Sequence, residues 1–388
     1  MFPKISPQDW ENLVQKQMKT EDIYDVLKKE NTEGITVKPY YSDVKTPLKN
    51  LPKVEESTHL VSDYHTDLEE NVFAFVLNEN VENLEEKAIF INNTDLAAHL
   101  KTEEGNKYFS LIDIFSDDEK GEINENLGHE LMAKSFDRNL CIDVSLHQNS
   151  GASIVQQLAF ALAKAKDLTE VFGANILKDL VFRFSVGGNY FFEIAKIRAF
   201  KLLFNQLSKE FGLNEVPFIF AETSLRNKSK ADPENNLIRS TLELSAAMIG
   251  GADAVYTNNF KIEGIDELSS EISFKQQIIL AYESIINVFD DAGNGSYYIE
   301  DITQQFAEKS WKVFLETEDN GGYCEMLKKG EIQKMVYEHA LTEQQWVEEG
   351  KQKIIGVNLY PKVEKTKDAD ALYSEKELRA VRLSEMFE

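Results

Sequence analysis

Short apolar runs recur between residues 57 and 319 of this chain, and each is followed by a polar turn and a segment with helical periodicity. The apolar runs lie at residues 59–64, 87–92, 108–115, 140–146, 180–186, 216–223, 252–260 and 285–291. The helix-period segments include residues 66–84, 152–166, 189–211, 233–249, 272–285 and 302–317. Strands that alternate with helices pair in parallel through right-handed crossovers. Eight units in about 260 residues are the count and length of a (β/α)8 barrel, so the sequence predicts an α/β fold of the TIM-barrel class.

A doubly wound open sheet is the competing α/β architecture. Such sheets commonly bind nucleotides through a glycine-rich turn that follows a strand. Neither G-x-G-x-x-G nor G-x-x-x-x-G-K-[ST] follows any of the apolar runs, and we therefore favour the barrel.

An N-terminal region, residues 1–56, precedes the predicted barrel at residues 57–319. It holds a short amphipathic helix with a capped start at Ser6-Pro7, and an extended stretch follows at residues 34–41. This region is too poor in core side chains to fold alone. We expect either a packing extension of the barrel or an arm that wraps around a partner.

A C-terminal helical tail or linker, residues 320–388, follows the predicted barrel. We expect a helix near residues 331–349 and a last helix opened by Ser374-x-x-Glu377. The tail has no core of its own, so it should lie across the barrel or lead toward another domain.

The chain carries 67 Asp and Glu residues against 42 Lys and Arg residues, a formal net charge of −25. A field of this sign repels phosphates, so neither nucleic acid nor a membrane is expected as a partner, and a polyphosphate cofactor is disfavoured. The two cysteines supply neither a disulfide framework nor a metal-ligand set, which is typical of a reducing compartment. No signal-peptide pattern is evident, and no apolar stretch approaches the roughly 20 residues of a membrane span. The sequence therefore predicts a soluble, cytoplasmic protein.

Functional residues of a TIM barrel belong at the carboxyl ends of its strands. His147 is a histidine at such an end, where it serves either as a hydrogen-bonded structural residue or as a general base. Arg183 lies in mid-strand, and it either pairs inside the barrel with Glu222 or Asp143 or faces the helices. The set expected at the strand ends is rich in carboxylates and amides: Tyr64, His65, Asp113, Asp117, Ser145, Leu146, His147, Gln148, Ser185, Glu222, Thr223, Thr257, Asn258, Asp290 and Asp291.

Neither a metal centre nor a nucleophile is predicted. Asp63-x-His65-x-Asp67 has potential ligands, but it precedes a helix start, where acidic residues favour capping and the helix dipole. No G-x-S-x-G is present, and Cys141 lies inside an apolar strand, where a thiol is inert.

Several long motifs occur here in the same order as in one known family. VSLHQNSGASIVQQLAF (Val144–Phe160) parallels G-Y-H-I-R-E-A-G-A-x-x-V-Q-E-L-A-F, and FFEIAKIRAFK (Phe191–Lys201) parallels F-F-E-E-I-A-K-x-R-A-x-R. The chain therefore resembles the barrel domain of adenosylcobalamin-dependent acyl-CoA mutases, the methylmalonyl-CoA mutase family. The resemblance continues at PENNLIR (Pro233–Arg239), GGADAVYTNNF (Gly250–Phe260), DAGNGSYYIE (Asp291–Glu300) and GVNLY (Gly356–Tyr360).

The resemblance implies radical chemistry inside the barrel, in which cleavage of a cobalt–carbon bond leads to abstraction of a substrate hydrogen. The strand-end residues that the family pattern needs differ here. The Tyr-His pair is replaced by Ser145-Leu146, the nearby arginine by Gln148, and a second histidine by Gly187 within Val186–Gly188. Where the family has Q-T this chain has Glu222-Thr223. The Q-Q before Pro233 becomes Ala231-Asp232, and the tunnel segment Y-T-G-R-P-W has no counterpart between Tyr41 and Glu56.

These combined losses point to relaxed demand for catalysis. We expect the small (beta) subunit of a heterodimer in this family, structural and non-catalytic, whose large subunit holds adenosylcobalamin and substrate. The holoenzyme would interconvert methylmalonyl-CoA and succinyl-CoA in propionate metabolism, and the tail of this chain would lead toward an absent cobalamin-type domain. No catalytic, cofactor-binding or metal-binding residue is expected here, and acyl-CoA is not expected to bind. A vestigial pocket would hold Ser145, Leu146, His147, Gln148, Arg183, Gly187, Glu222, Thr223, Asn258 and Asp291.

Two alternatives stay open. An active acyl-CoA mutase barrel, completed by a separate cobalamin-binding chain, would bind acyl-CoA. A barrel with unrelated, metal-assisted chemistry would instead use the carboxylates Asp113, Glu222 and Asp291.

Overall fold

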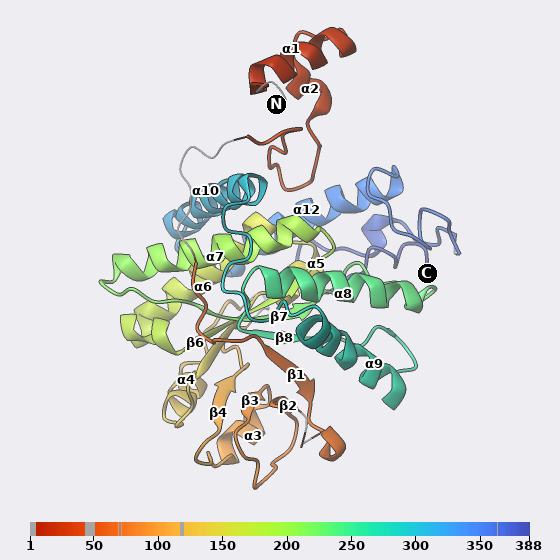
Figure 1. Cartoon of the computed structure of the whole chain (residues 1–388). Helices are drawn as coiled ribbons and strands as arrows, with labels where there is room; N and C mark the ends of the chain where they lie inside the picture. The colour runs from red at the N-terminus through yellow and green to blue at the C-terminus, as the bar shows by residue number, and fades with distance from the viewer. Residues whose placement is uncertain (1–4, 43–50, 69, 71, 117–119, 363) are drawn as a thin grey trace.

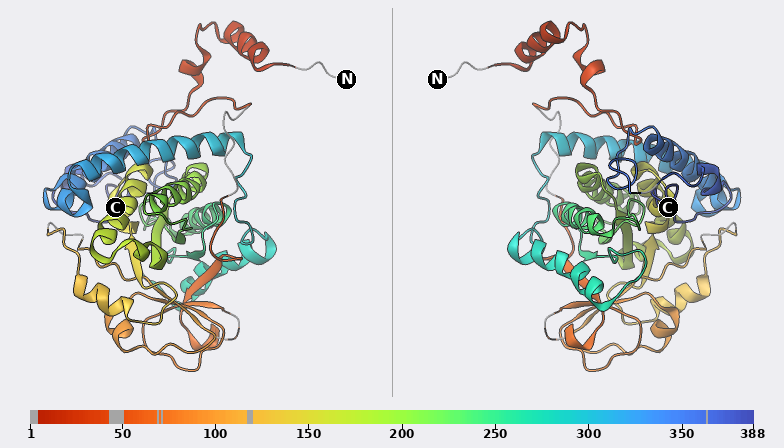
Figure 2. Two further views of the ribbon diagram at one scale, coloured as in Figure 1. Left: turned by 90° about the vertical axis from the view of Figure 1, so that its left-hand side faces the viewer. Right: turned by 90° about the vertical axis from the view of Figure 1, so that its right-hand side faces the viewer.

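A computed structural model describes residues 5–42, 51–68, 70, 72–116, 120–362 and 364–388 of the chain. A sheet lies at the centre of this part, helices surround it, and an N-terminal arm stands away from the body (Figures 1 and 2). No helix in these residues combines the length and the apolar run that crossing a bilayer requires.

The described elements alternate along the chain between strands and helices. The strands are β1 (His59–Asp63), β2 (Ala74–Leu77), β3 (Ala88–Ile91), β4 (Lys107–Ser110), β5 (Leu140–Asp143), β6 (Leu180–Val186), β7 (Phe218–Thr223) and β8 (Ala254–Tyr256). The helices are α1 (Pro7–Met18), α2 (Ile23–Leu27), α3 (Thr94–His99), α4 (Glu125–Met132), α5 (Ser145–Ser150), α6 (Ile154–Phe172), α7 (Tyr190–Glu210), α8 (Pro233–Ile249), α9 (Glu267–Ile278), α10 (Tyr297–Asp319), α11 (Gly322–Lys328) and α12 (Glu331–Glu348). Short 3-10 segments are η1 (Thr66–Leu68), η2 (Ala174–Asp179) and η4 (Ala369–Ala371), and η3 (Ile279–Glu283) is a π-helix that continues α9.

The described strands form one parallel sheet of eight strands in the order β4-β3-β2-β1-β8-β7-β6-β5. β1, the first strand, pairs with both the second and the last strand, since Val61 lies opposite both Ala74 of β2 and Tyr256 of β8. The outer strands β4 and β5 and the segments next to them meet through single bridges, among them the one from Asp113, after β4, to Cys141 of β5, and these bridges nearly close the barrel. The predicted TIM-barrel fold is therefore confirmed.

Two predicted barrel elements are wrong. One strand was missed and one predicted strand is absent from the described residues, so the predicted number of strands is still eight. In the described part of residues 66–84, a short η1 and then β2 replace the predicted helix. β2 is buried on both faces, so its four apolar residues lack the alternation that marks a strand in a sequence. The strand predicted for residues 285–291 is also wrong, because Ile285 has a φ of +55° and turns follow it.

The predictions for the two flanking regions differ in their outcome. The capped start is confirmed, since the Ser6 hydroxyl accepts a hydrogen bond from the Asp9 amide at 3.1 Å and Pro7 begins α1. The helix near residues 331–349 is confirmed as α12. The helix predicted to begin at Ser374 is wrong, because residues 374–388 form turns and irregular backbone.

The barrel interior is filled by aromatic rings. Phe109 stacks on Phe218 with ring centroids 4.6 Å apart and on Phe90 at 5.0 Å. Phe220 meets Phe90 at 5.1 Å. This packing occupies the pore, so polar chemistry is confined to the carboxyl ends of the strands.

α10 packs across both α6 and α7, so these two helices are covered on their outer side as well (Figures 1 and 2). α7 therefore buries charged side chains, which are costly to bury unless they are paired. Lys196 donates to the Ser185 carbonyl at 2.6 Å, and Arg198 pairs with Asp291 at 2.6 Å.

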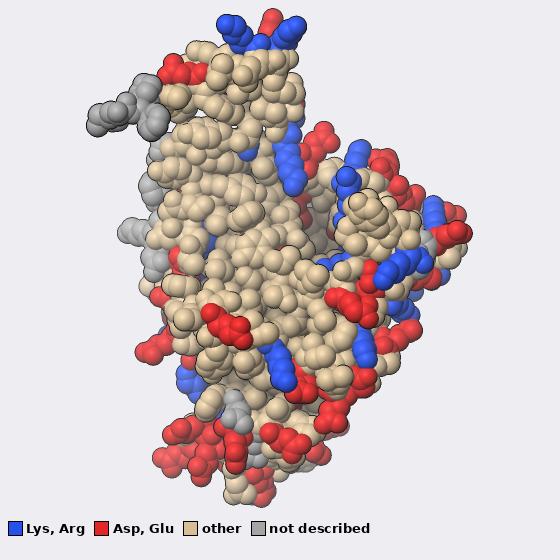
Figure 3. Space-filling model, turned by 45° about the vertical axis from the view of Figure 1, so that its right-hand side comes forward, with Lys and Arg blue, Asp and Glu red and all other residues tan. Residues whose placement is uncertain are grey.

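The arm is anchored by its extended part, whereas α1 has no buried residue. The Thr36 amide donates to the Gln305 side chain of α10 at 2.8 Å, and the Thr36 carbonyl accepts from it at 3.0 Å. Lys38 pairs with Asp301 at 3.0 Å. α1 and α2 stand beyond these anchors, and on the face shown in Figure 3 acidic side chains gather at the opposite end of the molecule.

The stability of the barrel is expected to fall by about 2 kcal/mol between pH 7 and pH 3 through the single carboxyl group of Glu55. The contact with His59 Nε2 at 3.3 Å and the hydrogen bond from Lys107 at 2.7 Å outweigh burial and lower the pKa of Glu55 from 4.5 to about 2. A carboxyl group with a lowered pKa stabilises the fold above its unfolded pKa, and this stability is lost as the pH falls from about 5 toward 2.

Urea unfolding at both pH values checks this expectation. Glu55→Gln should remove that part of the pH dependence, whereas Glu56→Gln, at the exposed neighbour, should leave it intact. An unchanged difference between pH 7 and pH 3 in Glu55→Gln would contradict it.

Candidate functional site

A charged layer lies above the aromatic rings at the carboxyl ends of β5, β6 and β7. The strand register sets Asp143 opposite Arg183 and Ser185 opposite Glu222. Arg183 Nε donates to Glu222 Oε2 at 3.0 Å, and Arg183 Nη1 lies 3.3 Å from Asp143 Oδ2. The Ser185 hydroxyl donates to Glu222 Oε1 at 3.1 Å. Of the two orientations considered for Arg183, the structure shows the one inside the barrel.

The two carboxylates neutralise Arg183 in place. Burial alone would lower the pKa of Arg183, but the charges of Glu222 and Asp143 overcome it and raise this pKa above its ordinary value. Arg183 therefore stays charged, and its guanidinium pairs with the carboxylates of the same layer.

Tyr256 extends this layer toward β1. Its hydroxyl donates to Asp63 Oδ2 at 2.9 Å, and its ring stacks beside Phe220. Burial, and then the charge of Asp63, raise the pKa of Tyr256 well above its usual range, so this hydroxyl is a donor and not a base.

Asp63, His65 and Asp67 do not assemble a metal site. Asp63 is engaged by Tyr256, and His65 Nδ1 lies 3.7 Å from Asp67 Oδ2. Among the described residues, no group of three or more His, Cys, Asp or Glu side chains is arranged to hold a metal ion.

The connection after β5, which contains α5, and the loop after β7 bind each other through side-chain amides. The Ser224 hydroxyl donates to Gln148 Oε1 at 3.0 Å, and Asn149 Oδ1 accepts from the Leu225 amide at 3.0 Å. At the next strand end, Asn258 donates from its side chain to the Thr223 carbonyl at 2.6 Å. These amides hold the loops together.

The first residues of α5 lie at the same end of the barrel. Ser145 is buried, and its amide donates to Asp143 Oδ1 at 2.7 Å, whereas Leu146 is partly exposed. A Cβ on Gly187 would lie 3.0 Å from Glu193 Oε1 and 3.1 Å from Gln148 Nε2. Gly187 therefore allows α5 and α7 to approach closely.

His147 is buried beside α11. Its Nε2 lies 2.7 Å from the Tyr323 hydroxyl, and its ring packs on Phe160 and Tyr323. Of the two roles considered, this geometry supports the structural one. The partner Tyr323 is 176 positions away and no sequence signal indicated it.

The carboxylates Asp113, Glu222 and Asp291 do not form one site. Asp113 accepts from Lys164 at 2.7 Å, and Asp291 accepts from Arg198 at 2.6 Å and 3.1 Å. Glu222 belongs to the Arg183 layer, so each carboxylate has its own cation. Because residues 285–291 are not a strand, Asp290 and Asp291 do not stand at a strand end, and Asp117 lies outside the described residues.

The C-terminal tail covers the loops after β5 and β7, an arrangement that the sequence did not indicate in detail. The Val381 amide donates to the Asn149 carbonyl at 2.9 Å, and the Leu383 amide donates to the Arg226 carbonyl at 2.8 Å. Arg226 Nη1 donates back to the Val381 carbonyl at 2.8 Å. The Ser384 hydroxyl bonds the Lys228 carbonyl at 2.8 Å. The tail thus ties both loops at the carboxyl end of the barrel.

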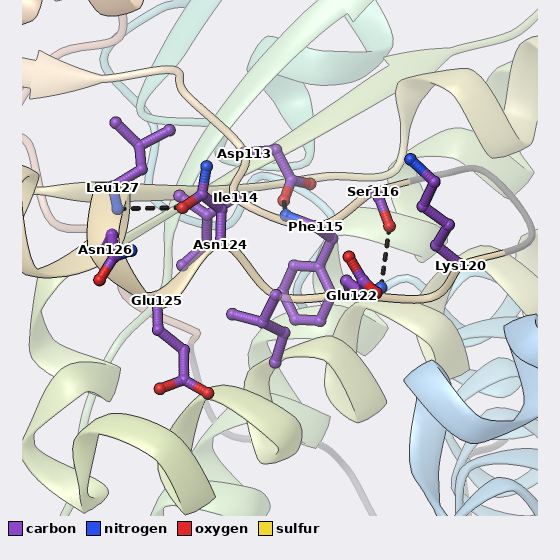
Figure 4. A pocket seen from close by; sticks show the side chains of 11 residues that line it. Asp113, Ile114, Phe115, Ser116, Lys120, Glu122, Asn124, Glu125, Asn126 and Leu127 are labelled. Atoms are coloured by element: carbon purple, nitrogen blue, oxygen red, sulfur yellow. Dashed lines mark hydrogen bonds between the residues drawn. The ribbon is translucent and has the colours of Figure 1, made fainter.

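A pocket of about 610 Å³ lies in the loop after β4 (Figure 4). Asp113 lines this pocket, and its carboxylate accepts a hydrogen bond from the Phe115 amide at 2.9 Å. The Glu122 amide donates to the Ser116 hydroxyl at 2.8 Å in the same loop. Lys120 also lines the pocket. Among the predicted strand-end residues that the structure describes, Asp113 lines it.

Both cysteines are free thiols with raised pKa values. Burial is the main cause for each, and the neighbouring carboxylates Asp143 and Asp167 add to it for Cys141 and Cys324, respectively. A raised pKa keeps a thiol protonated and unreactive, as predicted for Cys141.

A family model described as methylmalonyl-CoA mutase matches residues 132–388 of the chain. The methylmalonyl-CoA mutase of Rhizobium meliloti (strain 1021) is 31% identical over 246 residues, which cover 60% of this chain and 34% of that protein. The methylmalonyl-CoA mutase small subunit of Porphyromonas gingivalis (strain ATCC BAA-308 / W83) is 34% identical over 226 residues, 55% of this chain and 37% of that protein. The large subunit from the same organism is 30% identical over 226 residues, 55% of this chain and 31% of that protein. The chain spans about a third of the length of these curated relatives.

Proposed function

The chain belongs to the methylmalonyl-CoA mutase family, and on that basis we propose that it is a small, non-catalytic subunit of a heterodimeric mutase. In this proposal a larger subunit binds the acyl-CoA and adenosylcobalamin, which supplies the radical chemistry. The heterodimer interconverts methylmalonyl-CoA and succinyl-CoA. This chain stabilises the large subunit and does not turn over substrate.

The observation that carries the proposal is the self-contained charged layer at the carboxyl end of the barrel. Arg183, Asp143, Ser185 and Glu222 bond one another there, above a pore filled by phenylalanine rings. A catalytic barrel needs donors and bases that point at a substrate, and these groups point at each other.

The residues of this end do not fit adenosylcobalamin or an acyl-CoA. Gln148 and Asn149 are occupied by the loop after β7, and His147 is turned toward Tyr323. A net charge of −25 also opposes a ligand that carries phosphates. We therefore assign both ligands to the partner.

The names of the relatives support a partnership between subunits. A small and a large subunit are both described for Porphyromonas gingivalis, and each matches this chain. The two free cysteines are in keeping with a reducing, cytoplasmic location.

An active barrel that is completed by a separate cobalamin-binding chain is the second candidate. The observation in its favour is the family scaffold, in which Gly151 ends α5 with a φ of +105° and α6 and α7 follow. This candidate requires that the chain bind an acyl-CoA by itself.

We expect that this chain, mixed with adenosylcobalamin and methylmalonyl-CoA, gives no succinyl-CoA, and that activity appears only when the large subunit from the same organism is added. Isothermal titration of this chain with methylmalonyl-CoA at millimolar concentration should give no binding heat. Turnover by the chain alone, or saturable binding of the acyl-CoA, would establish the second candidate in place of the first.

Glu222→Gln tests the same point inside the assembled enzyme. The change keeps the shape of the charged layer but removes one carboxylate that would face a substrate. We expect kcat of the heterodimer to stay within twofold of the unaltered enzyme, because the reacting centre lies in the other subunit. A loss of 100-fold or more would place chemistry in this barrel.

A further inference from the structure

We infer that an apolar face beside the N-terminal arm docks the large subunit, an inference that rests on the proposed function. The face spans the start of α7, the outer side of α8, η3 and the start of α10. Its six large side chains are Phe191, Ile238, Leu242, Ile279, Tyr282 and Tyr297, and all six are exposed.

The elements that carry the face are neighbours. The Tyr190 hydroxyl lies 2.9 Å from the Ser245 hydroxyl, which joins the start of α7 to α8 one turn beyond Leu242. Gln276 of α9 donates to the Leu237 carbonyl of α8 at 2.6 Å. η3 begins three residues after Gln276 and continues α9 beyond this contact, and it carries Ile279 and Tyr282.

A row of aromatic contacts continues the face into the arm. Phe191 meets Tyr298 with ring centroids 5.4 Å apart, and Tyr298 meets Tyr41 at 5.1 Å. The preceding residue of the arm, Tyr40, packs on Trp10 of α1 with ring centroids 5.2 Å apart. The face and the arm therefore form one continuous surface, which a single partner can contact at both places.

The composition of the face is that of an interface centre. Interface centres are enriched in aromatic residues and depleted of charge. Ile238 is 63% exposed, Leu242 50% and Tyr282 67%, in a chain whose residues are 28% charged. On the side of the molecule shown in Figure 3, few charged side chains lie on the surface directly below the arm.

The charge of the chain favours a different partner over a second copy. Each copy carries a net charge of −25, and two such copies repel one another. A partner of different sequence is not bound to this repulsion between identical copies, and relatives named as small and large subunits of a mutase exemplify a pair of different chains. The occupant we assign is therefore the large subunit.

The test measures the affinity of the whole chain for the purified large subunit of the same organism by surface plasmon resonance. Leu242→Glu and Tyr282→Asp are each expected to raise Kd at least tenfold, because each buries a charge in the interface centre. The matched control is Leu315→Glu, at a leucine that is 46% exposed on α10, far along the helix from Tyr297. This variant should keep Kd within twofold, and thermal unfolding of all three variants checks that they fold.

Three outcomes would overturn the inference. If the unaltered chain does not bind the large subunit, both the proposed function and this inference are wrong. If the unaltered chain binds and Leu242→Glu binds equally well, the face is not the dock, although the proposed function stands. If sedimentation shows a homodimer that Leu242→Glu abolishes while the large subunit still binds, the occupant is a second copy.

Discussion

Replacing Arg198 with methionine is expected to lower the free energy of unfolding by about 3–5 kcal/mol. Arg198 lies on α7 and is fully buried together with Asp291, to which it donates from Nε at 2.6 Å and from Nη2 at 3.1 Å. Its Nη1 also donates to the Thr303 hydroxyl of α10 at 3.1 Å. Methionine has a similar length but no charge, so it leaves the Asp291 carboxylate buried without its cation.

Urea unfolding at pH 7 measures this loss, and two further variants make it specific. Arg198→Met combined with Asp291→Asn should recover part of the loss, because the amide is neutral and still accepts from the Leu51 amide. Lys312→Met removes an exposed pair with Glu316 on α10 and should cost less than about 1 kcal/mol. A similar loss in the Arg198 and Lys312 variants would contradict the role of burial.

Replacing Gly151 with alanine is expected to cost about 3 kcal/mol, of which roughly half comes from the backbone and half from a clash. Gly151 ends α5 with a φ of +105°, a conformation that L residues rarely adopt. An added Cβ would lie 2.5 Å from the Cβ and 2.9 Å from the Cα of Ala340 on α12. The change would therefore push α12 away from the carboxyl end of the barrel.

Gly330→Ala is the matched control for Gly151→Ala. Gly330 precedes α12 with a φ of +75° and a ψ of 9°, a left-handed conformation like that of Gly151, and nothing lies within 4 Å of its added Cβ, so it should show the backbone cost of about 1–2 kcal/mol alone. Combining Gly151→Ala with Ala340→Gly should return part of the extra loss, since it removes the closest atom and leaves the Ala340 Cα at 2.9 Å. Equal unfolding free energies for Gly151→Ala and Gly330→Ala would show that the contact with α12 adds no cost.

The fold class was predictable because the period of the sequence is a local property. The helix predicted at residues 233–249 coincides with α8, and those at residues 152–166 and 189–211 lie within a few residues of α6 and α7. The prediction failed where burial removes the periodic signal. β2 is apolar on both faces, and its four residues were absorbed into a predicted helix.

The candidate site was predictable in part. Residues on adjacent strands are brought together by the register, so the pairing of Arg183 with Glu222 and Asp143 follows from three strand ends. Asp291 was misplaced because it follows a segment that only resembles a strand, and its partner Arg198 stands on α7, outside the barrel pore.

The sequence by itself determined the α/β class, the barrel and the family resemblance, since each depends on local periodicity or on the order of motifs. Only the tertiary structure decided what the strand-end residues face. His147 meets Tyr323 from α11, and the tail crosses the loops after β5 and β7. Only packing also decided that Ile238 and Leu242 stay exposed beside the arm. Such contacts join residues far apart in the chain, and their geometry depends on how whole helices pack, which no local pattern encodes.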